Sequence, residues 1–105
     1  MKNLANFKVA VKTRECLVQA VYQMLFNDDS VSKVIDQFKD EHKAKKVDFK
    51  MFSLSLKSIN KNRKKIESIL TSLKIKSSSI ELIDKSILFF AINARVFGNR
   101  DTPSA

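Results

Sequence analysis

The side chains most able to do chemistry are few in this sequence, and their spacing favours binding over catalysis. His42 stands alone among charged residues, which predicts a surface histidine. Cys16 lies inside an apolar helical stretch and has no base at a spacing that suggests activation, so we expect a buried thiol. The acidic pairs Asp28-Asp29 and Asp40-Glu41 fall at expected turns and helix ends, where capping or solvation explains them. We therefore expect no enzymatic activity, no metal site and no cofactor.

Basic residues are more informative, because they form three clusters that can bind phosphates. The clusters are Lys8, Lys12 and Arg14; Lys43, Lys45 and Lys46; and Lys61, Arg63, Lys64 and Lys65. Positions 8 and 12 share one face of a helix. Twenty Lys and Arg against eleven Asp and Glu give a formal net charge of +9, which is typical of a partner of nucleic acid and less often of an anionic membrane. An alternative is that the lysines only solvate the surface, above all in the second and third clusters.

Length and composition favour a single helical domain over 1–105. One glycine and one proline in the whole chain argue for helices joined by polar loops, so the expected fold class is all-α. A single cysteine excludes an intramolecular disulfide and favours a cytoplasmic location. No window approaches the roughly 18 apolar residues of a membrane-spanning helix, so we expect no membrane partner.

Apolar residues recur in steps of three and four over four stretches, which predicts about four helices. We expect them at about 7–26, 31–42, 49–73 and 80–97, with a basic loop between the second and the third. The apolar seam of the third stretch is typical of a helix packed along a bundle partner. The fourth stretch is apolar almost all the way round, so it should lie centrally in the fold.

Three seams define the expected core, and that of the third helix holds Phe52, Leu56, Ile59, Ile66, Leu70 and Leu73. The first helix should bury Leu17, Val21, Met24 and Leu25. The fourth should bury Ile80, Ile83, Ile87, Phe90, Ala94 and Phe97. Arg63 interrupts the seam of the third helix, and we expect it near a seam end or reaching to water, with a buried ion pair as the alternative.

Local signals predict where the helices begin and end. Asp29 or Ser30 can cap the second helix, and Asp48 the third. Ser78 and Glu81 have the spacing of a capping box ahead of the fourth helix. Glycine at position 98 should end that helix, and the Asp-Thr-Pro at 101–103 is how a further helix begins.

Four runs in the chain, taken in order, resemble the NusB family of transcription antitermination factors. The run 14–23, RECLVQAVYQ, resembles the A-R-x-x-A-V-Q-A-L-Y-Q pattern of the family's opening helix. The run 49–52 with the long helix after it looks like the third helix, and 83–92 is similar to the segment E-K-A-V-L-R-I-A-x-Y-E-L. The run 101–103 resembles a D-x-P that precedes the next helix. The resemblance covers essentially the whole chain and implies a NusB-like helical bundle, with about four helices present and the C-terminal helices missing.

The resemblance also implies a function. Family members bind the boxA element of ribosomal RNA leader transcripts together with the small-subunit ribosomal protein NusE, and the pair helps to load an antitermination complex on RNA polymerase. Their RNA contacts centre on an arginine-rich N-terminal stretch, where this sequence has Lys12 and Arg14, with Lys8 one turn away. Ala10 and Val11 stand where other members carry arginine.

Two further positions match family residues that face NusE, namely Tyr22 and Asp84, whereas Asn93 and Ala94 depart from the Y-E of the later segment. Missing C-terminal helices would leave part of the fourth helix uncovered, so we expect either a homodimer through that helix or marginal stability. Two alternatives to the antitermination factor are a NusB-like accessory domain of a ribosomal RNA methyltransferase and a helical module that binds only protein.

Overall fold

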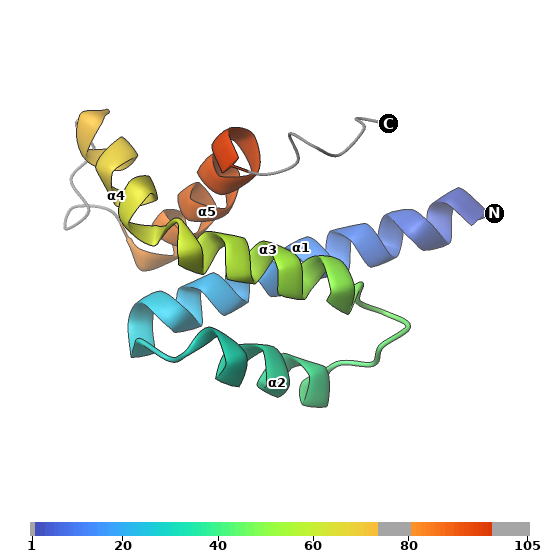
Figure 1. Cartoon of the computed structure of the whole chain (residues 1–105). Coiled ribbons are helices and arrows are strands. Elements are labelled where there is room, and N and C mark those ends of the chain that lie inside the picture. Colours follow the sequence, from blue (N-terminus) through green and yellow to red (C-terminus); the bar gives the residue numbers. More distant parts are fainter. Residues whose placement is uncertain (1, 74–80, 98–105) are drawn as a thin grey trace.

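The protein is built from helices, as the near absence of glycine and proline predicted. The computed structural model describes residues 2–73 and 81–97 (Figure 1). Its elements are α1 (Lys2–Asn27), α2 (Val31–Glu41), α3 (Phe49–Lys61), α4 (Arg63–Ser72), α5 (Leu82–Ile92) and the π-helical turn η2 (Asn93–Phe97). No strand occurs among these residues, so the all-α prediction is confirmed.

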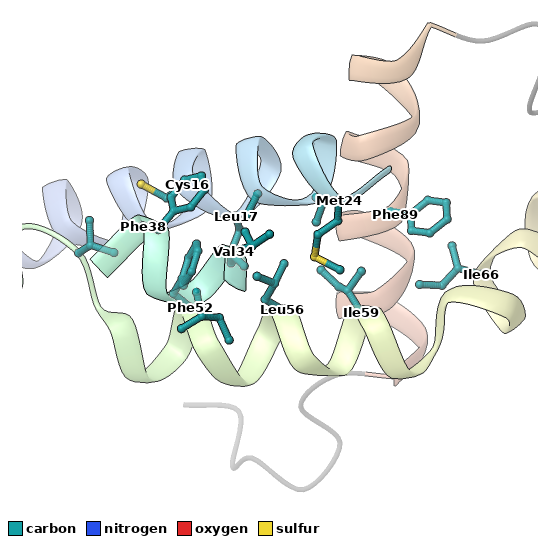
Figure 2. Close-up of a cluster of buried hydrophobic side chains, with 14 of the residues drawn as sticks. Cys16, Leu17, Met24, Val34, Phe38, Phe52, Leu56, Ile59, Ile66 and Phe89 are labelled. Carbon is teal, nitrogen blue, oxygen red and sulfur yellow. The ribbon is translucent and has the colours of Figure 1, made fainter. Parts of the chain in front are cut away.

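Helix α1 is the common packing partner of three other helices. It packs most extensively against α5, then against α3 and α2. Figure 1 shows α1, α2 and α3 running lengthwise through the molecule, with α4 continuing from the end of α3. In Figure 2, α5 stands steeply across α1 and α3 beside Met24 and Ile59. The expectation that the fourth apolar stretch lies centrally is met only in the packing of α5 on α1: α1 holds the central position, and Ile87 and Ala91 of α5 are exposed.

The core fills the space between these helices. Its fully buried side chains include Leu17, Leu56, Phe52 and Phe89, and Figure 2 shows Phe89 pointing toward Ile66 of α4. Burial of one such large apolar side chain contributes about 1.5–3 kcal/mol. The buried apolar residues are Cys16, Leu17, Ala20, Val21, Met24, Val34, Ile35, Phe38, Val47, Phe52, Leu56, Ile59, Ile66, Leu70 and Phe89.

The predicted caps of the second and third helices are confirmed. The backbone N–H of Lys33 donates to Ser30 Oγ at 3.3 Å, so Ser30 is the N-cap of α2. The N–H of Met51 donates to Asp48 Oδ1 at 3.1 Å, so Asp48 caps α3. These bonds satisfy N–H groups that a helix start otherwise leaves without partners.

The single long helix predicted over 49–73 is wrong, because the chain breaks at Asn62 into α3 and α4. Asn62 leaves helical geometry at φ −98° and ψ 11°, and its side chain is buried. Its Nδ2 donates to Asn93 Oδ1 at 3.1 Å, and Asn93 Nδ2 donates to Ser58 Oγ at 3.1 Å. These two hydrogen bonds connect the break between α3 and α4 to Asn93, the first residue of η2. Leu73, expected at the end of the seam, is exposed.

Arg63 follows this break and begins α4, which explains why it interrupts the apolar spacing. Its guanidinium lies 3.7 Å from Asp28 Oδ1, and the Asp28 side chain is exposed. The ion pair is therefore a surface one, worth at most about 1 kcal/mol. The expectation of a seam-end position is confirmed over that of a buried pair.

The starts of the predicted first and fourth helices need correction. Helix α1 begins at Lys2 instead of about position 7, and the side chain of Leu4 in this added stretch is exposed. No apolar seam in the sequence marked the stretch. Helix α5 begins at Leu82 with Glu81 as its extended N-cap and no side-chain cap bond, so the capping-box prediction is wrong. The residues at 78, 80, 98 and 101–103 lie outside the described part of the chain.

The buried face of α5 also differs from the predicted seam. Ser86, Phe89 and Asn93 point inward, whereas Ile87 keeps 47% of its surface exposed. The face is rotated by one residue, or about 100°. Asn93 is held inward by the bonds to Asn62 and Ser58, and Ser86 Oγ donates to the Leu82 carbonyl at 2.9 Å. Polar groups that satisfy one another in this way can be buried without a large penalty.

Candidate nucleic-acid interface

Helix α1 presents Lys8 and Lys12 to solvent on one face. Four residues of an α-helix turn by about 400°, so the two side chains lie only about 40° apart around the axis. Both are exposed. Lys12 lies close enough to Cys16 for its positive charge to act on that thiol. This face of α1 therefore offers two cations, one helical turn apart, to an anionic partner.

The basic loop between α2 and α3 is fixed against the same half of α1. The backbone N–H of Asp48 donates to Thr13 Oγ1 at 2.9 Å, and that hydroxyl donates to the Val9 carbonyl at 2.7 Å. Thr13 is completely buried, and Val47 beside this bond is buried as well. Residues 13 and 48 are far apart in the sequence, so this bond places the loop next to α1.

Helices α1 and α2 are also joined directly, by hydrogen bonds between two glutamine side chains. Gln23 Nε2 donates to Gln37 Oε1 at 2.7 Å, and Gln37 Nε2 donates back to Gln23 Oε1 at 3.2 Å. With the Thr13–Asp48 bond, this contact makes α1 and α2 antiparallel. The C-terminal end of α2 lies beside the second half of α1, and the loop that follows it leads to Thr13. In Figure 1 this loop lies at the same end of the molecule as the N-terminal half of α1.

Five exposed lysines lie on these two adjoining segments, and we call them the lysine cluster. Its members are Lys8, Lys12, Lys43, Lys45 and Lys46. Glu15 on α1, Glu41 at the end of α2 and Asp48 at the start of α3 are exposed acids close to it. Lysine ammonium groups bind phosphates as point charges and carry little geometric preference for a base. The cluster can therefore hold a nucleic-acid backbone by charge.

Arg14, expected to act with Lys8 and Lys12, lies elsewhere. Two residues turn α1 by about 200°, so Arg14 is about 160° away from Lys12 around the helix. It lines an apolar hollow with Val18 and Ile87, and it also borders a second hollow with Met51 of α3. The structure thus joins two of the three predicted RNA-binding residues to the basic loop and separates the third. No local sequence signal links positions 8 and 12 to the loop.

The third basic cluster surrounds the break between α3 and α4, and part of it is engaged within the protein. Arg63 pairs with Asp28, and the Lys65 ammonium lies 5.9 Å from the centre of the Phe97 ring. Lys61 and Lys64 are exposed. Two of its four members, Arg63 and Lys65, thus contact other side chains of the protein. The exposure of Lys61 and Lys64 is compatible with the alternative that lysines there only solvate the surface.

Tyr22 and Asp84 lie on the two helices that pack most extensively together, α1 and α5. Tyr22 is 37% exposed, and its ring stacks on Phe26 at a centroid distance of 6.0 Å. Asp84 is exposed in the first turn of α5, where its negative charge interacts favourably with the positive end of the helix dipole. Both side chains are accessible to a protein partner.

His42 and Cys16, the residue types most able to take part in catalysis, are packed against other parts of the fold. His42 is half-buried and stacks on Phe38 at 5.6 Å, so it is less exposed than expected. Burial raises the pKa of the Cys16 thiol, an effect that Lys12 opposes and Glu15 reinforces. Within 2–73 and 81–97, no three His, Cys, Asp or Glu side chains gather into a potential metal site. None of the helices in these ranges has the length and apolar character needed to cross a membrane.

Comparison with known proteins identifies relatives over most of the chain. A model of the NusB family matches residues 11–104. The transcription antitermination protein NusB of Tolumonas auensis is 32% identical over 81 residues, which cover 76% of this chain and 59% of the relative. The protein of the same name from Clostridium acetobutylicum is 29% identical over 94 residues, covering 88% of this chain and 69% of the relative. No solved structure matches the chain.

Proposed function

Because this chain belongs to the NusB family, we propose that it is a non-enzymatic transcription antitermination factor that binds RNA. The chain spans 59% of the length of the Tolumonas auensis relative, and both relatives are named for antitermination. Those names favour this function over that of an accessory domain in a ribosomal RNA methyltransferase. In finer detail, the proposed target is the boxA element of ribosomal RNA transcripts, bound together with NusE within the antitermination complex on RNA polymerase.

The observation that carries the proposal is the lysine cluster. Lys8 and Lys12 stand beside a loop with three further lysines, and the buried Thr13–Asp48 bond holds the loop in place. A prepositioned group of cations loses less conformational freedom on binding than the same residues on a free loop. Each lysine that neutralises one phosphate of a single strand contributes about 0.7 to the slope of log K against log salt concentration. Five such contacts correspond to a slope of about −3.5.

Arg14 would complement the cluster from the other side of α1. Its planar guanidinium can stack on a base or pair with a base edge, which lysine does poorly. Since Arg14 and Lys12 lie on different faces, an RNA that contacts both must pass around α1. We therefore assign phosphate binding to Lys8 and Lys12 and base contact to Arg14.

Fluorescence anisotropy with a boxA RNA, with and without NusE, tests this function. We expect weak binding by the chain alone and tighter binding with NusE. The pair Lys8→Gln and Lys12→Gln should lower the salt slope by about 1.4. The matched control pair, Lys61→Gln and Lys64→Gln, removes the same charge from an exposed site outside the cluster. Equal effects of the two pairs would contradict a specific RNA surface, and no binding by the wild type would contradict the function.

The proposed NusE contact involves Tyr22 and Asp84. Asp84→Lys should weaken association with NusE without changing the circular-dichroism spectrum. Asp40→Lys, which reverses an exposed charge on α2, is the matched control. Unchanged NusE binding by the Asp84 variant would place the partner surface elsewhere.

A further inference from the structure

A second lysine-lined surface lies in the groove between α2 and α3. The groove encloses about 480 Å³, within the range of pockets that hold small ligands. Lys39 of α2 and Lys50 and Lys57 of α3 line it, together with the carboxylate of Asp36. Three lysines against one carboxylate leave two net positive charges, so the groove favours an anionic occupant.

The wall of this groove holds a polar group that the fold leaves unused. Ser53 Oγ is buried and has no hydrogen-bond partner among the described residues. Serine and threonine hydroxyls in helices often bond to the carbonyl four residues earlier, and Thr71 does so to Glu67 at 3.0 Å. A buried hydroxyl without a partner is uncommon, because it costs about 1–3 kcal/mol. Because this oxygen is buried, a molecule in the groove meets it only if the Ser53 side chain rotates toward the groove.

The remaining lining suits a nucleotide better than a simple anion. Phe49 is half-buried in the wall, where its ring is fixed against Phe52 at a centroid distance of 5.7 Å and an interplanar angle of 81°. Aromatic rings and cations together are what single-stranded nucleic acids bind. Asp36 would repel a bare phosphate, but a carboxylate accepts hydrogen bonds from the amino group of cytosine.

We infer that the α2–α3 groove binds a single-stranded stretch of the same RNA, adjoining the segment held by the lysine cluster. This inference rests on the proposed function. The basic loop connects the two surfaces, because it follows α2 after Lys39 and precedes Lys50 of α3. From Lys50 to Lys57, α3 rises about 10 Å, the length of about three stacked nucleotides.

The test compares two RNAs, bare boxA and boxA extended by unstructured nucleotides at both ends. The pair Lys50→Gln and Lys57→Gln should lower the salt slope for the extended RNA by about 1.4 and leave the slope for bare boxA unchanged. The control pair Lys61→Gln and Lys64→Gln should change neither slope. These lysines are exposed, so the variants should fold as the wild type does, which circular dichroism verifies. With 4-thiouridine in the extensions, photocrosslinks should appear in peptides of α2 and α3.

Four results would overturn the inference, and they are distinguishable. If neither RNA binds the wild type, the proposed function fails and the groove inference fails with it. If Lys8→Gln with Lys12→Gln weakens bare boxA while the groove pair leaves both RNAs unchanged, only the groove inference fails. If the groove pair weakens binding of polyglutamate and not of RNA, the occupant is an acidic protein segment. Crosslinks confined to α1 and the basic loop would overturn the inference as well.

Discussion

Replacing Thr13 by valine tests how the basic loop is held against α1. The two side chains have nearly the same shape, so the buried position stays filled while the hydroxyl is lost. The Asp48 N–H, which donates to that hydroxyl at 2.9 Å, loses its acceptor. The same change frees the loop that carries three lysines of the cluster. We therefore expect Thr13→Val to lower the free energy of unfolding and to loosen the attachment of the loop to α1.

The size of the effect follows from the surroundings of the bond. An N–H left without an acceptor costs about 1–3 kcal/mol when it is buried. Asp48 is an exposed residue, so water satisfies part of the lost bond and the lower end, about 1–2 kcal/mol, applies. In a domain of this size each kcal/mol lowers Tm by about 4–8 °C, so we expect a decrease of about 4–16 °C.

Thermal and urea unfolding of the wild type and Thr13→Val measure this loss, and amide hydrogen exchange locates it. The Asp48 amide should exchange faster in Thr13→Val, whereas Thr13→Ser should keep its protection because the hydroxyl remains. Thr71→Val is the matched control: its hydroxyl bonds to the Glu67 carbonyl at an exposed position, and the change should cost no more than about 0.5 kcal/mol. A Thr13→Val variant with wild-type stability and wild-type Asp48 exchange would refute the reasoning.

Three further predictions concern other parts of the fold. Asn62→Ala and Asn93→Ala should be non-additive in a double-mutant cycle, with a coupling of about 0.5–3 kcal/mol, because their side chains bond to each other; additive losses would contradict the link. If the protein forms a homodimer through α5, Ile87→Lys should shift sedimentation toward the monomer, and a wild type that is monomeric at all concentrations disproves the dimer. Since burial raises the pKa of Cys16, native protein should react slowly with a thiol reagent. The stability from burying the neutral thiol should be present below the unfolded thiol pKa, about 8.5, and decline above it, a trend that Cys16→Ala should reduce.

Local physics explains which parts of the fold the sequence predicted well. The N-caps Ser30 and Asp48 depend on bonds to N–H groups three residues ahead, so the residue types alone reveal them. The apolar steps of three and four correctly placed Leu17, Val21 and Met24 in the core. They did so because the helix repeat converts spacing into a shared face without reference to the rest of the chain.

Contacts between distant residues explain the errors. The break at Asn62 and the inward turn of Asn93 depend on each other across the chain, and a periodicity analysis treats both as interruptions of an apolar face. Ile87 follows the apolar pattern and is exposed, because the buried bonds of Asn93 set the rotation at that end of α5. A polar pair that satisfies its own hydrogen bonds can thus outweigh the burial of one more apolar side chain.

For the candidate interface, the sequence by itself determined the excess of positive charge, the shared helix face of Lys8 and Lys12, and the resemblance that indicates RNA as the partner. Only the tertiary structure decided which basic residues act together. It brought the basic loop beside Lys12 through the bond between Thr13 and Asp48, and it left Arg14 on a different side of α1. The physical reason is that charge and helix spacing are local properties of the chain. The grouping of surface charges depends on how the buried residues beneath them pack and bond.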